Sequence, residues 1–202
     1  ASPFADADLQ FGVHYLIFPG FGDIHVHLRE GQEYKEDYTT GSLAAINGGI
    51  TFVADMPNNP LAPVNKELLE RKRAKAQEAM VDVHLIAGIG PGTEPIDGHS
   101  HYKAFMCESV GDLFFENYDD LERTLEKYSG LYVSFHAEDP ELIRKYPERP
   151  PEAEIKAVDK AIELIRRYNL KGNICHLSTK EGLRLIENAR LVYADIFCEV
   201  TP

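Results

Sequence analysis

Residues 131–177 read LYVSFHAEDPELIRKYPERPPEAEIKAVDKAIELIRRYNLKGNICHL. This segment opens on a short apolar run, 131–136, and closes on another, 173–177. Between the two runs, residues 151–168 place apolar side chains three and four positions apart, which makes one apolar stripe along a helix. A strand, a helix and a second strand in this order predict a β-α-β unit of a parallel sheet.

The same alternation continues on both sides of this unit. Several of the apolar runs are almost continuous and rich in β-branched residues, as expected for parallel strands that are buried on both faces. The predicted strands are 22–28, 50–56, 83–89, 102–106, 131–136, 173–177 and 196–200. The predicted helices are 35–47, which should stop at Gly48-Gly49, then 66–79, 119–128, 151–168 and 179–189. Residues 90–101 have no helical periodicity, so we expect the helix after the third strand to be absent or very short.

Two parallel α/β architectures fit this pattern: an open doubly wound sheet and a (β/α)8 TIM-type barrel. No Gly-rich phosphate loop follows the first strand, which disfavours the dinucleotide-binding form of the open sheet. Polar side chains instead occupy the carboxyl halves or ends of successive strands, where barrel enzymes build their sites. These side chains are His25, His27, Asn58, Lys103, His136 and His176. The sequence therefore favours the barrel.

The extent of the barrel also follows from the pattern. Seven strands can be counted, whereas a closed barrel needs eight. We therefore expect residues 19–202 to form a barrel that lacks its last strand. The family resemblance described below implies that residues 1–18 are the remnant of an N-terminal β segment. We expect the sequence to be part of a longer protein rather than a truncated product, because an open barrel leaves sheet edges exposed.

The composition narrows the class of protein. The chain has 202 residues, 44% of them hydrophobic and 27% charged, which is typical of a globular protein and excludes a disordered chain. The formal net charge of −12 argues against nucleic acid or an anionic membrane as a partner, and no apolar run is long enough to span a membrane. Three widely spaced cysteines, an odd number, indicate reduced thiols and a cytoplasmic location.

Four of the polar side chains are histidines with a metal-binding pattern. His25 and His27 are two residues apart, so in a strand both imidazoles point to the same face and can reach one metal ion. A single His-x-His pair is equally well explained by packing. His136 and His176 also lie at strand ends, and four histidines at one barrel mouth favour a metal centre. Neutral imidazole is a ligand well suited to zinc.

Lys103 lies within an apolar strand, in HYKAFM, and has two interpretations. Its stem could pack in the core while its amine pairs with a carboxylate. Alternatively, burial disfavours the charged form of a lysine, and a neutral amine can add CO2 to form a carbamate. A carbamate has two oxygens and can bridge two metal ions, which together activate water and polarise a carbonyl group.

Six motifs carry a family resemblance that runs from about residue 17 to residue 202. In chain order they read FPGFGDIHVHLRE, DMPNNP, YKAFM, FHAED, NICHLST and CEVTP. The set resembles the amidohydrolase superfamily, and more narrowly its dihydroorotases. The arginine of HVHLRE, together with MPN, separates this group from hydantoinase and allantoinase relatives, which share the histidine pair but usually lack that arginine.

The resemblance implies a role for each candidate residue. His25 and His27 would bind one Zn2+, His136 and His176 a second, carbamylated Lys103 would bridge both, and Arg29 with Asn58 would hold the carboxylate of dihydroorotate. An arginine fork suits a carboxylate, and strand alternation predicts Arg29 on the same face as the histidine pair. The alternatives are a surface ion pair for Arg29 and a turn role for Asn58.

The implied activity is the reversible, zinc-dependent cyclisation of N-carbamoyl-L-aspartate to L-dihydroorotate in pyrimidine biosynthesis. The catalytic aspartate of such enzymes is expected beyond Pro202, so no catalytic residue is assigned within these residues. The implied partners are the small-molecule substrate and either a second copy or an aspartate transcarbamoylase. Two alternatives stay open: a related cyclic amidase such as a dihydropyrimidinase, hydantoinase or allantoinase, and a silent dihydroorotase-like scaffold that binds aspartate transcarbamoylase.

Three further expectations concern neighbouring residues. Glu138 and Asp139 either orient an imidazole or cap a helix. Cys175 precedes His176 and should face away from the site by strand alternation. Four histidines lack a place at a strand end and are predicted not to bind metal, namely His14, His84, His99 and His101.

Overall fold

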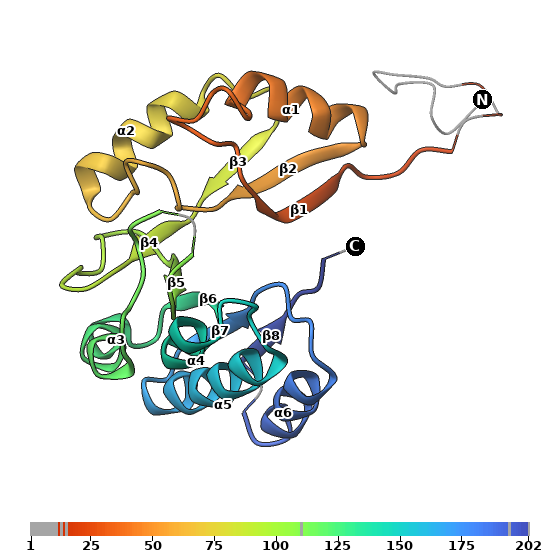
Figure 1. The fold of residues 1–202 in the computed structure, drawn as a ribbon. Helices are drawn as coiled ribbons and strands as arrows, with labels where there is room; N and C mark the ends of the chain where they lie inside the picture. Colours follow the sequence, from red (N-terminus) through yellow and green to blue (C-terminus); the bar gives the residue numbers. More distant parts are fainter. Residues whose placement is uncertain (1–11, 13, 15, 110, 194, 202) are drawn as a thin grey trace.

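A computed structural model of the chain describes residues 12, 14, 16–109, 111–193 and 195–201. Its parallel strands form a curved wall, and the helices pack along the outer side of the curve (Figure 1). One sheet has the order β1 (Phe21–Val26), β2 (Ile50–Asp55) and β3 (Asp82–Leu85). The other has the order β4 (Ala87–Ile89), β5 (His101–Phe105), β6 (Tyr132–His136), β7 (Lys171–Ile174) and β8 (Ile196–Cys198).

The predicted third strand is divided at Ile86 into β3 and β4. β3 pairs with β2 on one side, and β4 pairs with β5 on the other. At the division, the Ile86 amide still donates to the carbonyl of Asp55, at 3.1 Å. Strands of a barrel are staggered, so the early part of a strand can pair with the previous strand and the later part with the next. The two pieces therefore count as one barrel strand, and the described residues supply seven.

The first helix is shorter at its start than the pattern predicts. α1 (Tyr38–Asn47) begins after Asp37, whose side chain accepts from the amide of Thr40 in a capping box. The three residues from Lys35 are therefore excluded from the helix by the cap. The helix ends as predicted at Gly48-Gly49, where Gly49 has a φ of 79° that favours glycine.

The remaining helices agree with the prediction within a few residues, with one addition. They are α2 (Lys66–Ala76), α3 (Tyr118–Leu125) with a 3-10 turn at Glu126–Tyr128, α5 (Pro151–Arg167) and α6 (Lys180–Arg190). The addition is α4 (Pro140–Lys145), which Asp139 caps. Asp followed by Pro is a helix-start signal that the sequence did contain. Residues 90–100 form no helix, as predicted.

The hydrophobic core lies between the wall of strands and the outer helices. On α5 the predicted stripe is buried, and Val158, Ala161 and Ile165 are all 0% exposed. The predicted N-terminal β segment lies largely outside the described residues, and Leu16, Ile17 and Phe18 belong to no helix or strand. None of the described helices is long and apolar enough to cross a membrane.

Candidate metal centre at the strand ends

The first histidine pair lies at the carboxyl end of β1. His25 is in the strand and His27 follows its last residue, yet their ring centroids are only 5.4 Å apart. Burial, and next the charge of Arg29, lower the pKa of His27 to about 3. At neutral pH this imidazole is therefore uncharged and keeps a lone pair, which metal binding requires.

The second pair comes from β6 and from the chain just after β7. His136 Nδ1 and His176 Nε2 are 3.1 Å apart. The ring of His176 also lies 5.5 Å from that of His25, which brings the two pairs into one cluster. Burial is the main cause that lowers the pKa of His136, and it lowers that of His176 to about 4. All four predicted histidine ligands therefore meet at one end of the strands.

Lys103 lies in β5, close to both pairs. Its side chain is 1% exposed, and its charge lowers the pKa values of His27, His136 and His176. Its Nζ has no hydrogen-bond partner among the described residues, so the alternative in which it pairs with a carboxylate is not seen there. Leaving a buried polar group unpaired costs about 1–3 kcal/mol. A buried amine without a partner, next to several imidazoles, fits a site that holds metal ions and a lysine carbamate.

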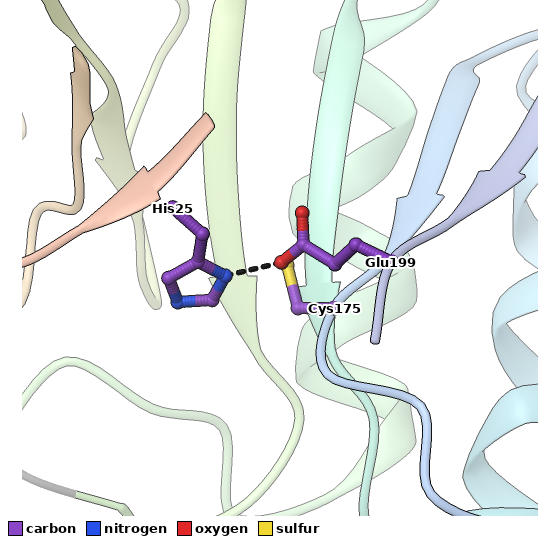
Figure 2. A group of neighbouring side chains, drawn as sticks. All are labelled: His25, Cys175 and Glu199. Atoms are coloured by element: carbon purple, nitrogen blue, oxygen red, sulfur yellow. Dashed lines mark hydrogen bonds and ion pairs between the residues drawn. The ribbon is translucent and has the colours of Figure 1, made fainter. Parts of the chain in front are cut away.

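Two carboxylates each hold one ring nitrogen of these histidines. His136 Nε2 donates to Glu138 Oε2 at 2.7 Å, and His25 Nδ1 donates to Glu199 Oε1 (Figure 2). Metal-binding histidines usually donate their second ring N–H to a carboxylate in this way, which fixes the ring and its tautomer. The remaining ring nitrogens are His25 Nε2 and His136 Nδ1, and the latter shares a hydrogen bond with His176 Nε2. The donor set therefore fits a metal centre.

Sequence reasoning assigned only part of these contacts. It left open whether Glu138 and Asp139 orient a histidine or cap a helix. The structure divides the two roles, because Glu138 holds His136 while Asp139 Oδ1 accepts from the amide of Leu142 at 2.9 Å. Glu199 was not considered, although its position just beyond β8, in CEVTP, was the available signal. Burial opposes ionisation of Glu199, but its hydrogen bond with His25 and that residue's charge outweigh burial and lower its pKa to about 2.

The prediction that Cys175 faces away from the site is wrong. Its sulfur lies within 4.8 Å of ligand atoms of His25 and Glu199. Figure 2 shows the three side chains as neighbours. β7 ends at Ile174, and His176 has a φ of 41°, so strand alternation no longer applies at these residues. Burial raises the pKa of Cys175 to about 11, which keeps it a thiol.

The two predicted substrate-binding residues both lie beside His27. The placement of Arg29 on the strand face is wrong, because β1 ends at Val26 and Arg29 has a φ of 56°. Its charge nevertheless acts on His27, and it forms no ion pair with any carboxylate in the described part of the chain. Asn58 follows β2, also acts on the pKa of His27, and has a buried Oδ1 without a hydrogen-bond partner among the described residues.

A cavity of about 590 Å³ opens next to this cluster, between β1 and the chain that follows β8. His25, His27, His176 and Glu199 line it. This volume is in the range of small-molecule sites.

Three of the other histidines form a separate group around the start of β5. His84 Nε2 lies 3.1 Å from His101 Nδ1, and His99 Nε2 contacts the carbonyl of His101 at 2.7 Å. His101 begins β5, whereas the predicted centre is at the carboxyl ends of the strands. That these histidines, and His14, do not bind metal stays a prediction.

Comparison with known proteins agrees with this geometry. A profile of the amidohydrolase family matches residues 16–189. Dihydroorotases of Pyrococcus furiosus and Pyrococcus abyssi are each 39% identical over 189 residues. The match covers 93% of this chain but 44% and 45% of those proteins, so the chain spans less than half the length of these relatives.

Solved structures give the same architecture. An L-hydantoinase from Arthrobacter aurescens superposes with a TM-score of 0.82 at 24% identity, over 91% of this chain and 47% of that one. A D-hydantoinase from a Thermus species superposes with a TM-score of 0.75 at 23% identity, over 91% and 46%. These neighbours confirm the predicted fold class, and the described strands are part of a TIM-type barrel. The family profile matches most of the chain, residues 16–189, and the chain therefore belongs to the amidohydrolase family.

Proposed function

We propose that this chain carries the metal-binding part of a zinc-dependent dihydroorotase. One observation carries the proposal: four histidines lie in one cluster, and a buried lysine next to them has an amine without a partner among the described residues. The name of the relatives at 39% identity supports the choice of reaction. The reaction is the reversible closure of N-carbamoyl-L-aspartate to L-dihydroorotate, a step of pyrimidine biosynthesis.

Each predicted ligand has a role in this proposal. His25 and His27 would hold one Zn2+, His136 and His176 would hold the second, and Lys103 would serve both as a carbamate. When bound, the two ions supply Lewis acidity and lower the pKa of water at the site. Glu199 and Glu138 accept one ring N–H each from His25 and His136, which leaves the other ring nitrogen of each histidine as the lone-pair donor.

Substrate recognition falls to Arg29 and Asn58. The guanidinium can hold the carboxylate of dihydroorotate through two parallel hydrogen bonds. Asn58 acts on the pKa of the same imidazole as Arg29, that of His27, and its amide can add a further hydrogen bond to that carboxylate. Proton transfer to the leaving ring nitrogen is assigned to an aspartate outside this sequence, as the resemblance implies. The proposed setting is the cytoplasm, with a homodimer or a complex with aspartate transcarbamoylase as the assembly.

A related cyclic amidase is the second candidate, since the solved neighbours are hydantoinases. Such enzymes act on rings without a carboxylate, and Arg29 beside the histidines favours the charged substrate. A catalytically silent scaffold would not need a buried, unpaired lysine next to a cluster of histidines, so this feature disfavours that alternative.

The test uses the whole protein that contains this chain. Elemental analysis should find zinc at two ions per chain, and kcat/KM should be far higher for dihydroorotate than for dihydrouracil, which lacks the carboxylate. Equal rates on the two substrates would favour the hydantoinase-like reading. Full activity in metal-free, chelator-treated protein would contradict the metal centre.

A further inference from the structure

A buried ion pair lies behind the loop that carries Arg29. Lys72, on α2, and Asp55, at the end of β2, are both 0% exposed, and Lys72 Nζ lies 2.8 Å from Asp55 Oδ2. Burying an ion pair is expensive unless each charge is also hydrogen-bonded, and a hydrophobic pair in its place is often no less stable. Neither residue has a part in the proposed metal centre, so the pair needs another explanation.

Asp55 is hydrogen-bonded on both oxygens. Its Oδ1 accepts from the backbone amide of Leu28 at 2.9 Å, and its Oδ2 accepts from the hydroxyl of Tyr38 at 3.0 Å. Burial, then the charge of Asp55, raises the pKa of Tyr38, so the hydroxyl stays protonated and remains a donor. Asp55 therefore fixes the residue immediately before Arg29.

Lys72 reaches the residue immediately after Arg29 through one amide side chain. Its Nζ donates to Asn59 Oδ1, and Asn59 Nδ2 donates to the backbone carbonyl of Glu30 at 3.2 Å. Asn59 is also the neighbour of Asn58. The ion pair therefore connects the residues on both sides of Arg29 with the loop that carries Asn58, the other residue predicted to bind the substrate carboxylate.

Arg29 needs such support, because its φ of 56° is in the left-handed region. This conformation costs a non-glycine residue roughly 1–2 kcal/mol and persists only where the surroundings hold it. Hydrogen bonds at Leu28 and Glu30 hold it from both sides.

We propose that Asp55, Lys72 and Asn59, here called the Asp55 network, are positioning residues that aim Arg29 and Asn58 at the substrate carboxylate. The inference rests on the proposed function for the identity of that carboxylate. In the described part of the chain, the network has no hydrogen bond to a proposed metal ligand, and it acts through the two loops. It thereby sets the preference for a charged ring over a neutral one.

A purely stabilising role makes different predictions, and three variants separate the two. Asn59→Ala removes the link to Glu30 while the buried pair stays. Tyr38→Phe removes one hydrogen bond to Asp55 but keeps the hydrogen bonds at Leu28 and Glu30. It therefore controls for the loss of a buried hydrogen bond that does not release Arg29. Lys75→Met removes an exposed lysine of the same helix, which pairs only with Glu78, at 2.8 Å, among the described residues.

The experiment combines hydrogen exchange and steady-state kinetics on the whole zinc-loaded protein. For Asn59→Ala we expect faster amide exchange in the peptide that contains residues 28–31, and a KM for dihydroorotate raised about tenfold with unchanged kcat. Its kcat/KM for dihydrouracil should not change. Tyr38→Phe and Lys75→Met should leave all three quantities at the wild-type values.

Each outcome bears on the inference. Unchanged exchange in Asn59→Ala would overturn it, and so would an equal loss with the two substrates or the same kinetic change in Tyr38→Phe. If wild type shows no preference for dihydroorotate, the proposed function fails, whereas the exchange data still decide whether the network holds the loop. A folded Lys72→Met variant should show faster amide exchange in residues 28–31 and a higher KM for dihydroorotate than Asn59→Ala.

Discussion

Replacing Glu138 by glutamine should lower the affinity for one of the two zinc ions and leave the affinity for the other unchanged. Glu138 Oε2 accepts from His136 Nε2 at 2.7 Å and is held in turn by Arg149, whose second nitrogen donates to the carbonyl of Glu108 at 2.8 Å. Glutamine has nearly the same shape but lacks the charge that fixes the imidazole tautomer. Loss of such a partner typically costs 10–100-fold in metal affinity, which is about 1.4–2.8 kcal/mol.

The assay is competition for zinc between the metal-free whole protein and a chromophoric chelator. We expect a Kd raised about 10–100-fold for one of the two ions, the one held by His136 and His176, with the other unchanged. Asp139→Ala is the matched control, because Asp139 is the next residue and caps α4 without contacting a histidine. It should lower the free energy of unfolding but not the zinc affinity. Wild-type binding in Glu138→Gln, or equal weakening in Asp139→Ala, would refute the reasoning.

Three further changes have clear expected outcomes. Lys103→Ala should lose the bridged pair of ions and most activity, and small carboxylic acids that mimic the carbamate should restore part of it; full activity without them would show that the bridge has another source. Arg29→Ala should lower kcat/KM for dihydroorotate by roughly 10–100-fold and leave dihydrouracil unaffected, whereas equal damage to both would remove the carboxylate role. Ile165→Ala, at a side chain that is 0% exposed, should lower the free energy of unfolding by about 2–5 kcal/mol in a denaturant titration, and a change below that range would mean that the core packs differently.

The parts of the fold that follow from local periodicity were predictable from sequence. Each strand that carries a site residue was recognised from its apolar run, and parallel strands necessarily bring their carboxyl ends together. For this reason His25, His27, His136 and His176 could be grouped without a structure. α5 was predicted because its apolar stripe is long and regular.

The errors arose where strands end and the chain turns. Strand alternation was extended to Arg29 and Cys175, although β1 and β7 stop before them. Arg29 and His176 then take positive φ values, which no property of a non-glycine residue announces. The division of the third strand at Ile86 follows from the stagger between neighbouring strands, which one strand's own sequence does not contain.

Long-range polar contacts were also beyond sequence reasoning. Glu199 and His25 are 174 positions apart, and Asp55 meets Lys72 across the interface between a strand and a helix. In the sequence, Glu199 and Lys72 resemble ordinary surface charges. Only the folded chain shows which charges are paired, and that the buried amine of Lys103 has no hydrogen-bond partner in the described residues.

The central claim is that two metal ions share Lys103. Anomalous diffraction at the zinc edge, from crystals of the whole protein grown with zinc and bicarbonate, tests it directly. We expect two peaks, one against His25 and His27 and one against His136 and His176, with density for a carbamate on Lys103 between them. No peak at these histidines, or zinc bound only at His84 and His101, would contradict the account.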